Sequence, residues 1–387
     1  MGEQPSSADT PLWAVVELEQ FTTPEQTQAS QWRRSLRSAS TWLMGKNSAE
    51  QQVKEENELR ALPEVKLAHL VPPIDWAPAA KALAQQLNDQ KAPVAFFITP
   101  PHSGHVAVVS QWAEAHRFAC LPSPTLSELA EGDTQWIERC ASQREWAVPA
   151  LERYFLRHTQ GIQGVREFLE RALSGRLGQG VIGCDSWAYA YLQEVIGIDG
   201  APVFTLQSME GEQLSRYFAD IATHTGAPPQ VYSTRTGNQV LAKTEGSAAN
   251  KKAPPKGENK ELQRLAAHCR GHIGIAWHYW RERLREPLSD DEKALWLADA
   301  LAEAELPPDT GDVATLVLHA LLIHGGLDDH SLGQLLPFSH HEALNARLAL
   351  QRKGIVTSCE GRWQIAPLSY ASVRQLLESR NYLVDPL

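Results

Sequence analysis

The chain has 387 residues, of which 43% are apolar and 21% are charged, an ordinary composition for a soluble globular protein of two or three domains. Its formal net charge of −10 argues against bulk electrostatic attraction to nucleic acid or to an anionic membrane. No stretch reaches the ~18–20 apolar residues of a membrane span. The first residues lack a basic segment followed by an apolar core, so we expect neither a membrane span nor a secretory leader.

Cysteine and histidine usage points to a reducing compartment and to no metal site. The cysteines are widely spaced, odd in number and form no C-x-x-C pair, which predicts reduced, mostly buried thiols and a cytoplasmic protein. They are Cys120, Cys140, Cys184, Cys269 and Cys359. No H-E-x-x-H spacing occurs, and the adjacent His340 and His341 would point about 100° apart on a helix.

The N-terminal region, residues 1–75, is expected to be partly irregular. Within it, residues 12–18 have the apolar content of a strand, and residues 26–43 space their large apolar side chains as a helix does. Asp75 is placed to cap a helix over residues 76–87. That helix leads directly to the most informative stretch of the chain.

Residues 93–112 have the layout of a phosphate-binding P-loop. Residues 94–98 are apolar, β-branched and aromatic, which predicts a buried parallel strand. A tight turn over residues 100–104 follows, and then apolar helical spacing over residues 104–116. Strand, glycine-bearing loop and helix is the order in which a P-loop presents backbone N–H groups to phosphate.

The residues that carry P-loop chemistry are nevertheless replaced. In the pattern G-x-x-x-x-G-K-[ST] aligned on Gly104, the first glycine is Thr99, the lysine is His105 and the hydroxyl residue is Val106. Two prolines also remove N–H donors from the loop. The candidate phosphate site therefore consists of Ser103, Gly104, His105 and Val106, without the usual lysine and magnesium ligand.

An acidic residue that is a candidate for the phosphate and magnesium site follows a later strand. Residues 180–184 form a small apolar run that ends at Asp185, and a helix pattern begins at once. A Walker-B acid has this position, at the carboxyl end of a strand, where it holds Mg²⁺ through water. Ser186 stands where an active enzyme of this type places a glutamate. The alternative is that Asp185 simply caps the following helix.

Strand and helix patterns alternate through this part of the chain. Short apolar runs at residues 117–121 and 202–206 predict strands, and residues 125–130, 148–173 and 212–221 predict helices, with a break near Gly161 and Gly164 in the second of these. Such alternation predicts a doubly wound parallel sheet with right-handed crossovers. The predicted fold class is therefore α/β, with a P-loop-like domain over residues 76–232.

The next two segments differ in character. Residues 233–260 are rich in Gly, Ser, Asn, Pro and Lys, which predicts a flexible basic linker, with a tether for nucleic acid as the alternative. Residues 261–306 predict a helical lid made of helices over residues 261–285 and 289–304, interrupted near Gly271.

The C-terminal segment, residues 310–387, predicts three helices, a β-hairpin and a closing helix, which is the order of a winged helix. The third helix is capped by Ser339, and the hairpin spans residues 355–365. In winged helices that bind DNA, the third helix enters the major groove and the wing contacts the backbone. The residues in these positions are Asn345, Arg347, Arg352, Lys353 and Arg362.

Taken in chain order, these features resemble the AAA+ and STAND ATPases of the origin-recognition or signal-transduction kind, over residues 76–387. The resemblance is architectural. It implies that Gly104 and His105 occupy the Walker-A turn and that Asp185 is the Walker-B acid. It also leaves oligomerisation open, because AAA+ relatives often oligomerise.

The function expected from these residues is that of a non-catalytic P-loop protein, a pseudo-ATPase that acts as an adaptor or regulator through contacts with a partner protein and needs no cofactor. One alternative is an ATPase with atypical motifs, in which the helix dipole and free N–H groups bind ATP and Mg²⁺ weakly. Another is a winged-helix regulator that binds DNA. Tryptophans in the less regular segments, Trp32, Trp42, Trp136 and Trp146, are the candidates for a partner surface.

Overall fold

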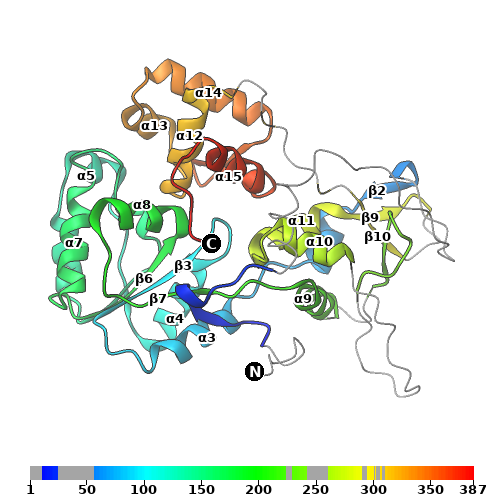
Figure 1. Ribbon diagram of the computed structural model, residues 1–387, viewed down its shortest axis with the longest axis horizontal. Coiled ribbons are helices and arrows are strands. Elements are labelled where there is room, and N and C mark those ends of the chain that lie inside the picture. The colour runs from blue at the N-terminus through cyan, green and yellow to red at the C-terminus, as the bar shows by residue number, and fades with distance from the viewer. Residues whose placement is uncertain are drawn as a thin grey trace. The chain divides into compact units, whose positions relative to one another are not determined.

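The computed structural model describes residues 11–24, 56–223, 229–241, 260–289, 294–299, 301, 306 and 310–387. The chain forms two compact units, each traced in Figure 1. The larger unit comprises residues 13–21, 75–207 and 303–387, and the smaller unit comprises residues 1–12, 22–74 and 208–302. The predicted helix over residues 26–43 and most of the predicted linker over residues 233–260 lie outside the described residues.

The larger unit is built on a six-stranded sheet in which only the first strand is antiparallel to its neighbour. The strand order is β1-β7-β3-β6-β5-β4. The strands are β1 (Val15–Glu17), β3 (Val94–Thr99), β4 (Ala119–Cys120), β5 (Glu145–Val148), β6 (Gln179–Asp185) and β7 (Val203–Leu206). This mostly parallel sheet confirms the predicted α/β class.

Both faces of the sheet are covered, as the apolar run of β3 indicates. Val94, Phe96 and Ile98 point into one apolar core, whereas Ala95 and Phe97 point into the other. The second core is completed by α3 (Ala77–Leu87) and α4 (His105–His116). The first is completed by helices that include α6 (Gln135–Ala141), α7 (Gln163–Leu173) and α8 (Ser186–Ile196). The short helix α5 (Leu126–Glu131) begins with a capping box at Thr125.

Two sequence predictions in this unit are wrong. The helical segment predicted over residues 148–173 is an α-helix only in α7, which follows the predicted break near Gly161, because the chain first forms the end of β5 and a short 3₁₀ turn, η4 (Leu151–Arg153). The proposed partner surface fails for Trp136 and Trp146, whose exposed fractions are 2% and 0%. Trp146 lies on β5 and its indole donates to the Leu177 carbonyl, so these rings fill the core. Trp32 and Trp42 lie outside the described residues.

The C-terminal part of the larger unit has three helices followed by an antiparallel hairpin, in the predicted order. Ser339 caps the third helix through a capping box with Glu342, as expected from the sequence. The elements are α12 (Asp312–Ile323), α13 (Asp329–Leu335), α14 (His340–Arg352), β11 (Val356–Cys359), β12 (Arg362–Ile365), η5 (Pro367–Ser369) and α15 (Tyr370–Ser379). This part packs into the same unit as the parallel sheet.

The smaller unit contains a second sheet, which the sequence did not predict. Its strand order is β2-β9-β10-β8, and the strands are β2 (Leu59–Ala61), β8 (Val231–Ser233), β9 (Leu284–Pro287) and β10 (Leu295–Leu297). The helix predicted over residues 289–304 is therefore wrong, because its buried Leu-Trp-Leu run is a strand. The unit also holds α2 (Glu64–Leu70), α9 (Gly211–Thr223), α10 (Lys260–His268) and α11 (Ile273–Arg283). The predicted interruption at Gly271 is confirmed between α10 and α11.

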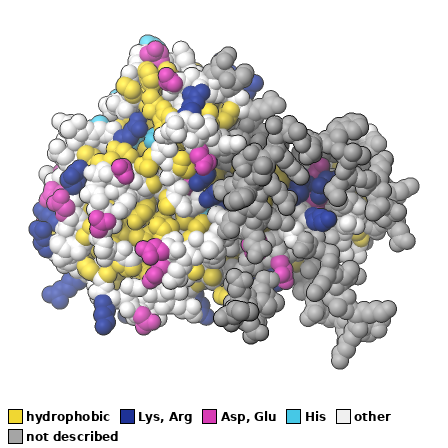
Figure 2. Space-filling view, viewed as in Figure 1, with side chains coloured by type: hydrophobic (Ala, Val, Ile, Leu, Met, Phe, Trp, Pro, Cys, Tyr) yellow, Lys and Arg dark blue, Asp and Glu magenta, His cyan; other side chains and the backbone are white. Residues whose placement is uncertain are grey.

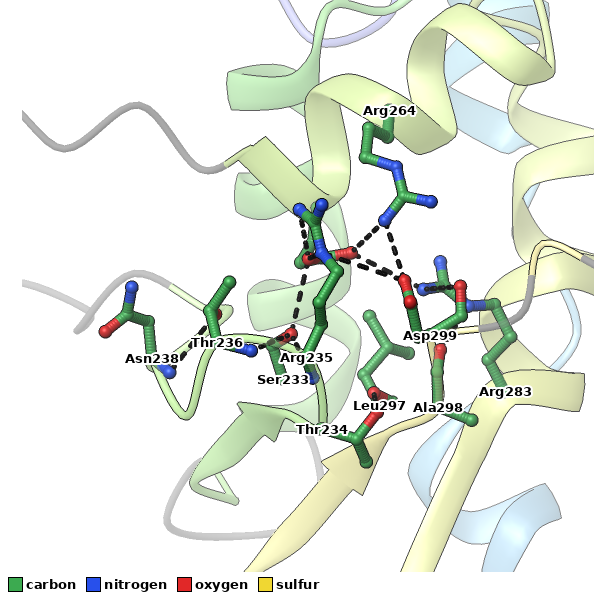
Figure 3. Close-up of polar contacts among 11 residues, drawn as sticks. Ser233, Thr234, Arg235, Thr236, Asn238, Arg264, Arg283, Leu297, Ala298 and Asp299 are labelled. Carbon is green, nitrogen blue, oxygen red and sulfur yellow. Dashed lines mark hydrogen bonds and ion pairs between the residues drawn. The ribbon is translucent and has the colours of Figure 1, made fainter. Parts of the chain in front are cut away.

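A buried carboxylate ties this sheet to α10 (Figure 3). The side chain of Glu261 is 5% exposed and accepts hydrogen bonds from Ser233 Oγ at 3.3 Å and from Arg235 Nε at 2.9 Å. Arg264 and Arg283 bring their guanidinium groups to its other oxygen, at 3.3 and 3.6 Å. Glu261 thus pairs with arginines that lie both before and after the segment joining β8 to α10.

Replacing Glu261 with alanine should therefore lower the free energy of unfolding of the smaller unit by about 3–5 kcal/mol, because the change leaves Arg283, which is 3% exposed, without its carboxylate. The matched control is Asp299→Ala, which removes a half-exposed partner of Arg264 and should cost about 1 kcal/mol or less. Urea titration followed by tryptophan fluorescence measures both. Equal losses in the two variants would contradict the assignment.

Among the helices in the described parts of the chain, none combines the length and the apolar character that crossing a membrane requires. All five cysteines are free, and Cys140, Cys184 and Cys269 are buried as expected, whereas Cys120 and Cys359 are exposed. On the face shown in Figure 2, acidic and basic side chains of the described residues are interspersed.

Candidate functional site

The loop between β3 and α4 lies at the carboxyl end of the parallel strands. Thr99, the last residue of β3, is in register with Asp185, the last residue of β6. The loop enters α4 through Gly104, whose φ of 85° favours glycine. A Cβ on Gly104 would also lie 2.4 Å from the Trp76 indole, so this position has no room for a side chain. The loop and the two strand ends thus lie where open α/β sheets bind ligands.

His105, which stands at the position of the P-loop lysine, is held by two side chains of its own chain. Its Nδ1 lies 3.1 Å from Thr99 Oγ1, and its Nε2 lies 3.0 Å from Glu152 Oε1. All three side chains are buried. Burial by itself raises the pKa of Glu152, but the charge and hydrogen bond of His105 outweigh it, so the pKa lies below its usual range. Both ring nitrogens of His105 are therefore engaged within the protein.

Glu152 also connects the loop to the neighbouring strand and to the C-terminal helices. Its second oxygen accepts a hydrogen bond from the Asp185 backbone N–H at 3.1 Å. Gly325, just after α12, packs on the Glu152 side chain so closely that a Cβ would lie 2.8 Å from Cγ. Sequence reasoning missed Glu152 because η4 was assigned to a long helix. The signal in the sequence that could have identified Glu152 is an acidic residue directly after a short apolar run.

Asp185 acts as a helix cap. Its Oδ1 accepts a hydrogen bond from the Trp187 N–H at 3.0 Å at the start of α8, which confirms the capping interpretation of the sequence. Burial, and then the negative charge of Glu152, raise the pKa of Asp185 well above its usual range. The negative charge of Glu152 therefore opposes ionisation of Asp185.

Ser186, the residue after Asp185, is held by Asp385 near the end of the described chain. Its Oγ donates to Asp385 Oδ2 at 2.7 Å. Tyr370 OH donates to the same oxygen at 3.0 Å, and Arg374 Nε donates to Asp385 Oδ1 at 2.9 Å. The side chain of Asp385 is fully buried, and Leu387 is buried in the first core of the sheet. We call residues 381–387 the C-terminal strap, whose end lies beside β3 and α8 in Figure 1.

A pocket of about 190 Å³ remains between the loop and the C-terminal helices. Its polar wall includes Gly104, His105, Val106, Glu152, Arg153 and Asp185. Its other wall consists of Leu321, Leu322 and Gly325 from α12 and its end, with Gln364 and Ile365 from β12. His102 Nε2 lies 2.9 Å from the Ile365 carbonyl, and burial lowers the pKa of His102 to about 4.

The structure thus brings together four of the five residues that the sequence assigned to the phosphate site, namely Gly104, His105, Val106 and Asp185. Ser103 is buried and its Oγ lies 3.4 Å from the Pro101 carbonyl, so it supports the loop behind the pocket. Within the described residues, no group of three or more His, Cys, Asp or Glu side chains is placed to hold a metal ion.

The residues considered for DNA contact are distributed differently from the expectation. Arg347 is 4% exposed, forms a bidentate pair with Asp329 at 2.9 and 2.8 Å, and lies 4.1 Å above the Trp363 ring. It therefore holds α14 against α13 and β12, and its guanidinium group is engaged within the fold. Asn345, Arg352 and Lys353 are exposed, and Arg362 is half-buried.

Comparison with known proteins assigns no family to this arrangement, since no protein-family model matches the chain and no curated protein matches it at a significant level.

Proposed function

We propose that this chain is a non-catalytic protein of the P-loop NTPase type, with an AAA+-like α/β domain and a winged helix, that acts as an adaptor or regulator. The observation that carries the proposal is the pairing of His105 with Glu152 beneath the C-terminal helices. A group that should meet a nucleotide phosphate instead meets an acid of the same chain.

The strand order supports the P-loop part of the proposal. Numbered along the chain, the five parallel strands run 5-1-4-3-2 across the sheet, which differs from the Rossmann and flavodoxin orders. The loop-bearing strand β3 lies beside the acid-bearing strand β6, so the loop and Asp185 are at the same end of the sheet. Three helices and a hairpin after residue 310 agree with a winged helix.

The chemistry of the site supports the absence of hydrolysis. Phosphoryl transfer in P-loop enzymes depends on a lysine at the β/γ-phosphates and on a hydroxyl and an acid at Mg²⁺. Here Val106 offers no oxygen ligand, Asp185 is engaged as a helix cap, and Ser186 donates to Asp385. The positions of the acid and of the residue after it are therefore occupied by side chains engaged within the fold.

The size of the pocket supports the proposal that the chain does not bind ATP. Pockets that enclose ligands of drug size have volumes of about 300–1,000 Å³. A volume of 190 Å³ is below this range, and residues of α12 and β12 form one of its walls. A nucleoside triphosphate would have to displace these C-terminal elements from the loop.

Isothermal titration calorimetry with ATP and Mg²⁺ tests the proposal. The full chain should give no binding heat at micromolar protein concentration. The double variant His105→Lys/Val106→Thr restores the two motif residues and should remain inactive as an ATPase, because α12 and β12 still wall the loop. A micromolar Kd for ATP in the wild type would overturn the proposal.

A further inference from the structure

Two histidines are buried where the first C-terminal helix packs on the parallel-sheet part of the larger unit. His319 lies on α12 and is 6% exposed, and His324, which directly follows α12, is 1% exposed. Within the described residues, neither ring nitrogen of either histidine has a hydrogen-bond partner. A buried imidazole in such a place is accommodated in its neutral form, because a buried charge needs a partner.

Both imidazoles pack on aromatic rings outside α12. The centroid of the His324 ring lies 5.0 Å from that of Phe155, which precedes α7. The His319 ring lies edge-on to Trp187 of α8, at 6.1 Å, and to Tyr382 of the C-terminal strap, at 5.0 Å. The two histidines therefore belong to the packing that holds α12 against α8 and against the segment between η4 and α7.

The charged groups that act on these histidines are cationic. Arg157, which lies between η4 and α7, opposes protonation of both rings. Arg362 of β12 and the imidazole of His158 oppose protonation of His324, as does His319 itself. A proton on either buried ring would therefore meet repulsion from the elements packed against α12.

The acids near these elements are paired with other groups. Glu152 pairs with His105, and Asp328 caps α13. Asp385 of the C-terminal strap pairs with Arg374. Among the described residues, no carboxylate forms an ion pair or a hydrogen bond with either buried histidine. Protonation of these rings would thus place uncompensated charge inside the packed interface.

We propose that His319 and His324 form a pH-sensitive latch, which holds α12 on the parallel-sheet part when both imidazoles are neutral and releases it when they are protonated. Burial, and then Arg157, lower the pKa of His319 to about 4, although the main chain of Leu383 acts in the opposite sense. Burial, and then Arg157 and Arg362, lower the pKa of His324 to about 3.

The sign of the pH response follows from these lowered pKa values. In an open state the rings reach water and regain an ordinary pKa near 6.5, so the open state binds protons that the closed state excludes. The closed state is favoured at pH 7 and loses this advantage as pH falls below 6.5. Each histidine should raise the ratio of open to closed molecules about 25-fold between pH 7 and pH 5.

His102 of the loop after β3 responds in the same direction. Its pKa is also lowered, and its Nε2 lies 2.9 Å from the Ile365 carbonyl of the hairpin. His102 is therefore kept in every variant, and its contribution remains as a constant background in each comparison.

The latch goes beyond the proposed function, because it states a condition under which the C-terminal helices separate from the sheet. Residues of α12 and β12 form one wall of the pocket at the loop, so release of α12 would uncover the pair of His105 and Glu152. The latch does not depend on whether the loop binds a nucleotide, so its test and the calorimetry with ATP can fail separately.

The test is amide hydrogen exchange of the full chain at pH 7 and pH 5, read by mass spectrometry and divided by the intrinsic exchange rates of unstructured peptides. A helix released from its packing loses most of its stability, so α12 amides report the opening. In the wild type their corrected rate should rise on the order of several hundred-fold at pH 5, since the two factors multiply. The amides of β3 and β6 should rise much less.

The double variant His319→Leu/His324→Leu should lose this several hundred-fold rise and keep only the background of His102. His341→Leu makes the same change at an exposed histidine of α14 and should keep the full rise. Arg157→Gln leaves the buried rings in place and removes the cation that acts on both. It should reduce the rise, because the pKa of each histidine in the closed state then moves toward its ordinary value.

Four outcomes would overturn the latch. One is an unchanged α12 rate between pH 7 and pH 5 in the wild type. Another is an equal rise in α12 and β3, which would mean that the larger unit unfolds as a whole. The third is an equal rise in the double variant and the wild type. The fourth is an unchanged rise in Arg157→Gln, which keeps the proposal testable even if the double variant does not fold.

Discussion

Asp385→Ala should lower the free energy of unfolding of the larger unit by about 3–5 kcal/mol, the cost of removing one member of a buried ion pair. The carboxylate of Asp385 is fully buried and accepts hydrogen bonds from Ser186, Tyr370 and Arg374. Alanine leaves two hydroxyl groups and a guanidinium group without their acceptor. Equilibrium unfolding in urea, followed by tryptophan fluorescence, gives the difference.

The control for this variant uses the same arginine. Glu378 also pairs with Arg374, at 3.5 Å, but its side chain is 61% exposed. Glu378→Ala should therefore change the free energy of unfolding by about 1 kcal/mol or less. If Asp385→Ala costs no more than Glu378→Ala, the C-terminal strap does not stabilise the larger unit and its packing has been misjudged.

Asp185→Asn should raise the stability at pH 7, by on the order of 1 kcal/mol or more, although the substitution removes an acid at a Walker-B position. The asparagine oxygen can still accept the Trp187 N–H, and asparagine caps helices as well as aspartate does. The difference is the charge, because Asp185 is buried beside Glu152 and its pKa is raised well above the usual range.

The sign of this stability change follows from how the free energy of unfolding depends on pH. A raised pKa means that the folded protein keeps the Asp185 proton at pH values where the unfolded chain has released it, so this residue lowers the free energy of unfolding as pH rises above about 3.9. The advantage of Asp185→Asn should thus be small near pH 4 and should increase toward pH 7. Asp328→Asn, which makes the same change at the partly exposed cap of α13, is the matched control. A destabilised Asp185→Asn at pH 7 would show that the carboxylate itself is needed.

The sequence predicted those parts of the fold in which a local pattern determines the structure. The β3 run over residues 94–98 is apolar at every position because both of its faces are buried, and the caps at Asp185 and Ser339 mark the starts of helices that the structure contains. The three C-terminal helices and the hairpin follow from periodicity and from turn residues. The loop residues Gly104, His105 and Val106 were found in the same way, by their spacing after a strand.

The rest depended on contacts between residues that are distant in the chain. Strand β5 was not predicted: Trp146 was placed in a less regular segment and Val148 at the start of a helical one, and only pairing with β6 makes this stretch a strand. The roles of Glu152 and Asp385 cannot be predicted locally either. Each is an acidic residue in an ordinary context until the fold places it against His105 or Ser186.

The contact between the C-terminal strap and α8 also affects the order in which the larger unit can fold during synthesis. Ser186 and Asp385 are separated by 199 residues, and residues 208–302 of the smaller unit lie between them in the chain. During synthesis, the strands and helices before residue 207 are made well before their last buried partners. Contacts of such long sequence separation slow folding, since the intervening chain must be ordered first. The start of α8 therefore lacks this buried partner until Asp385 has been synthesised.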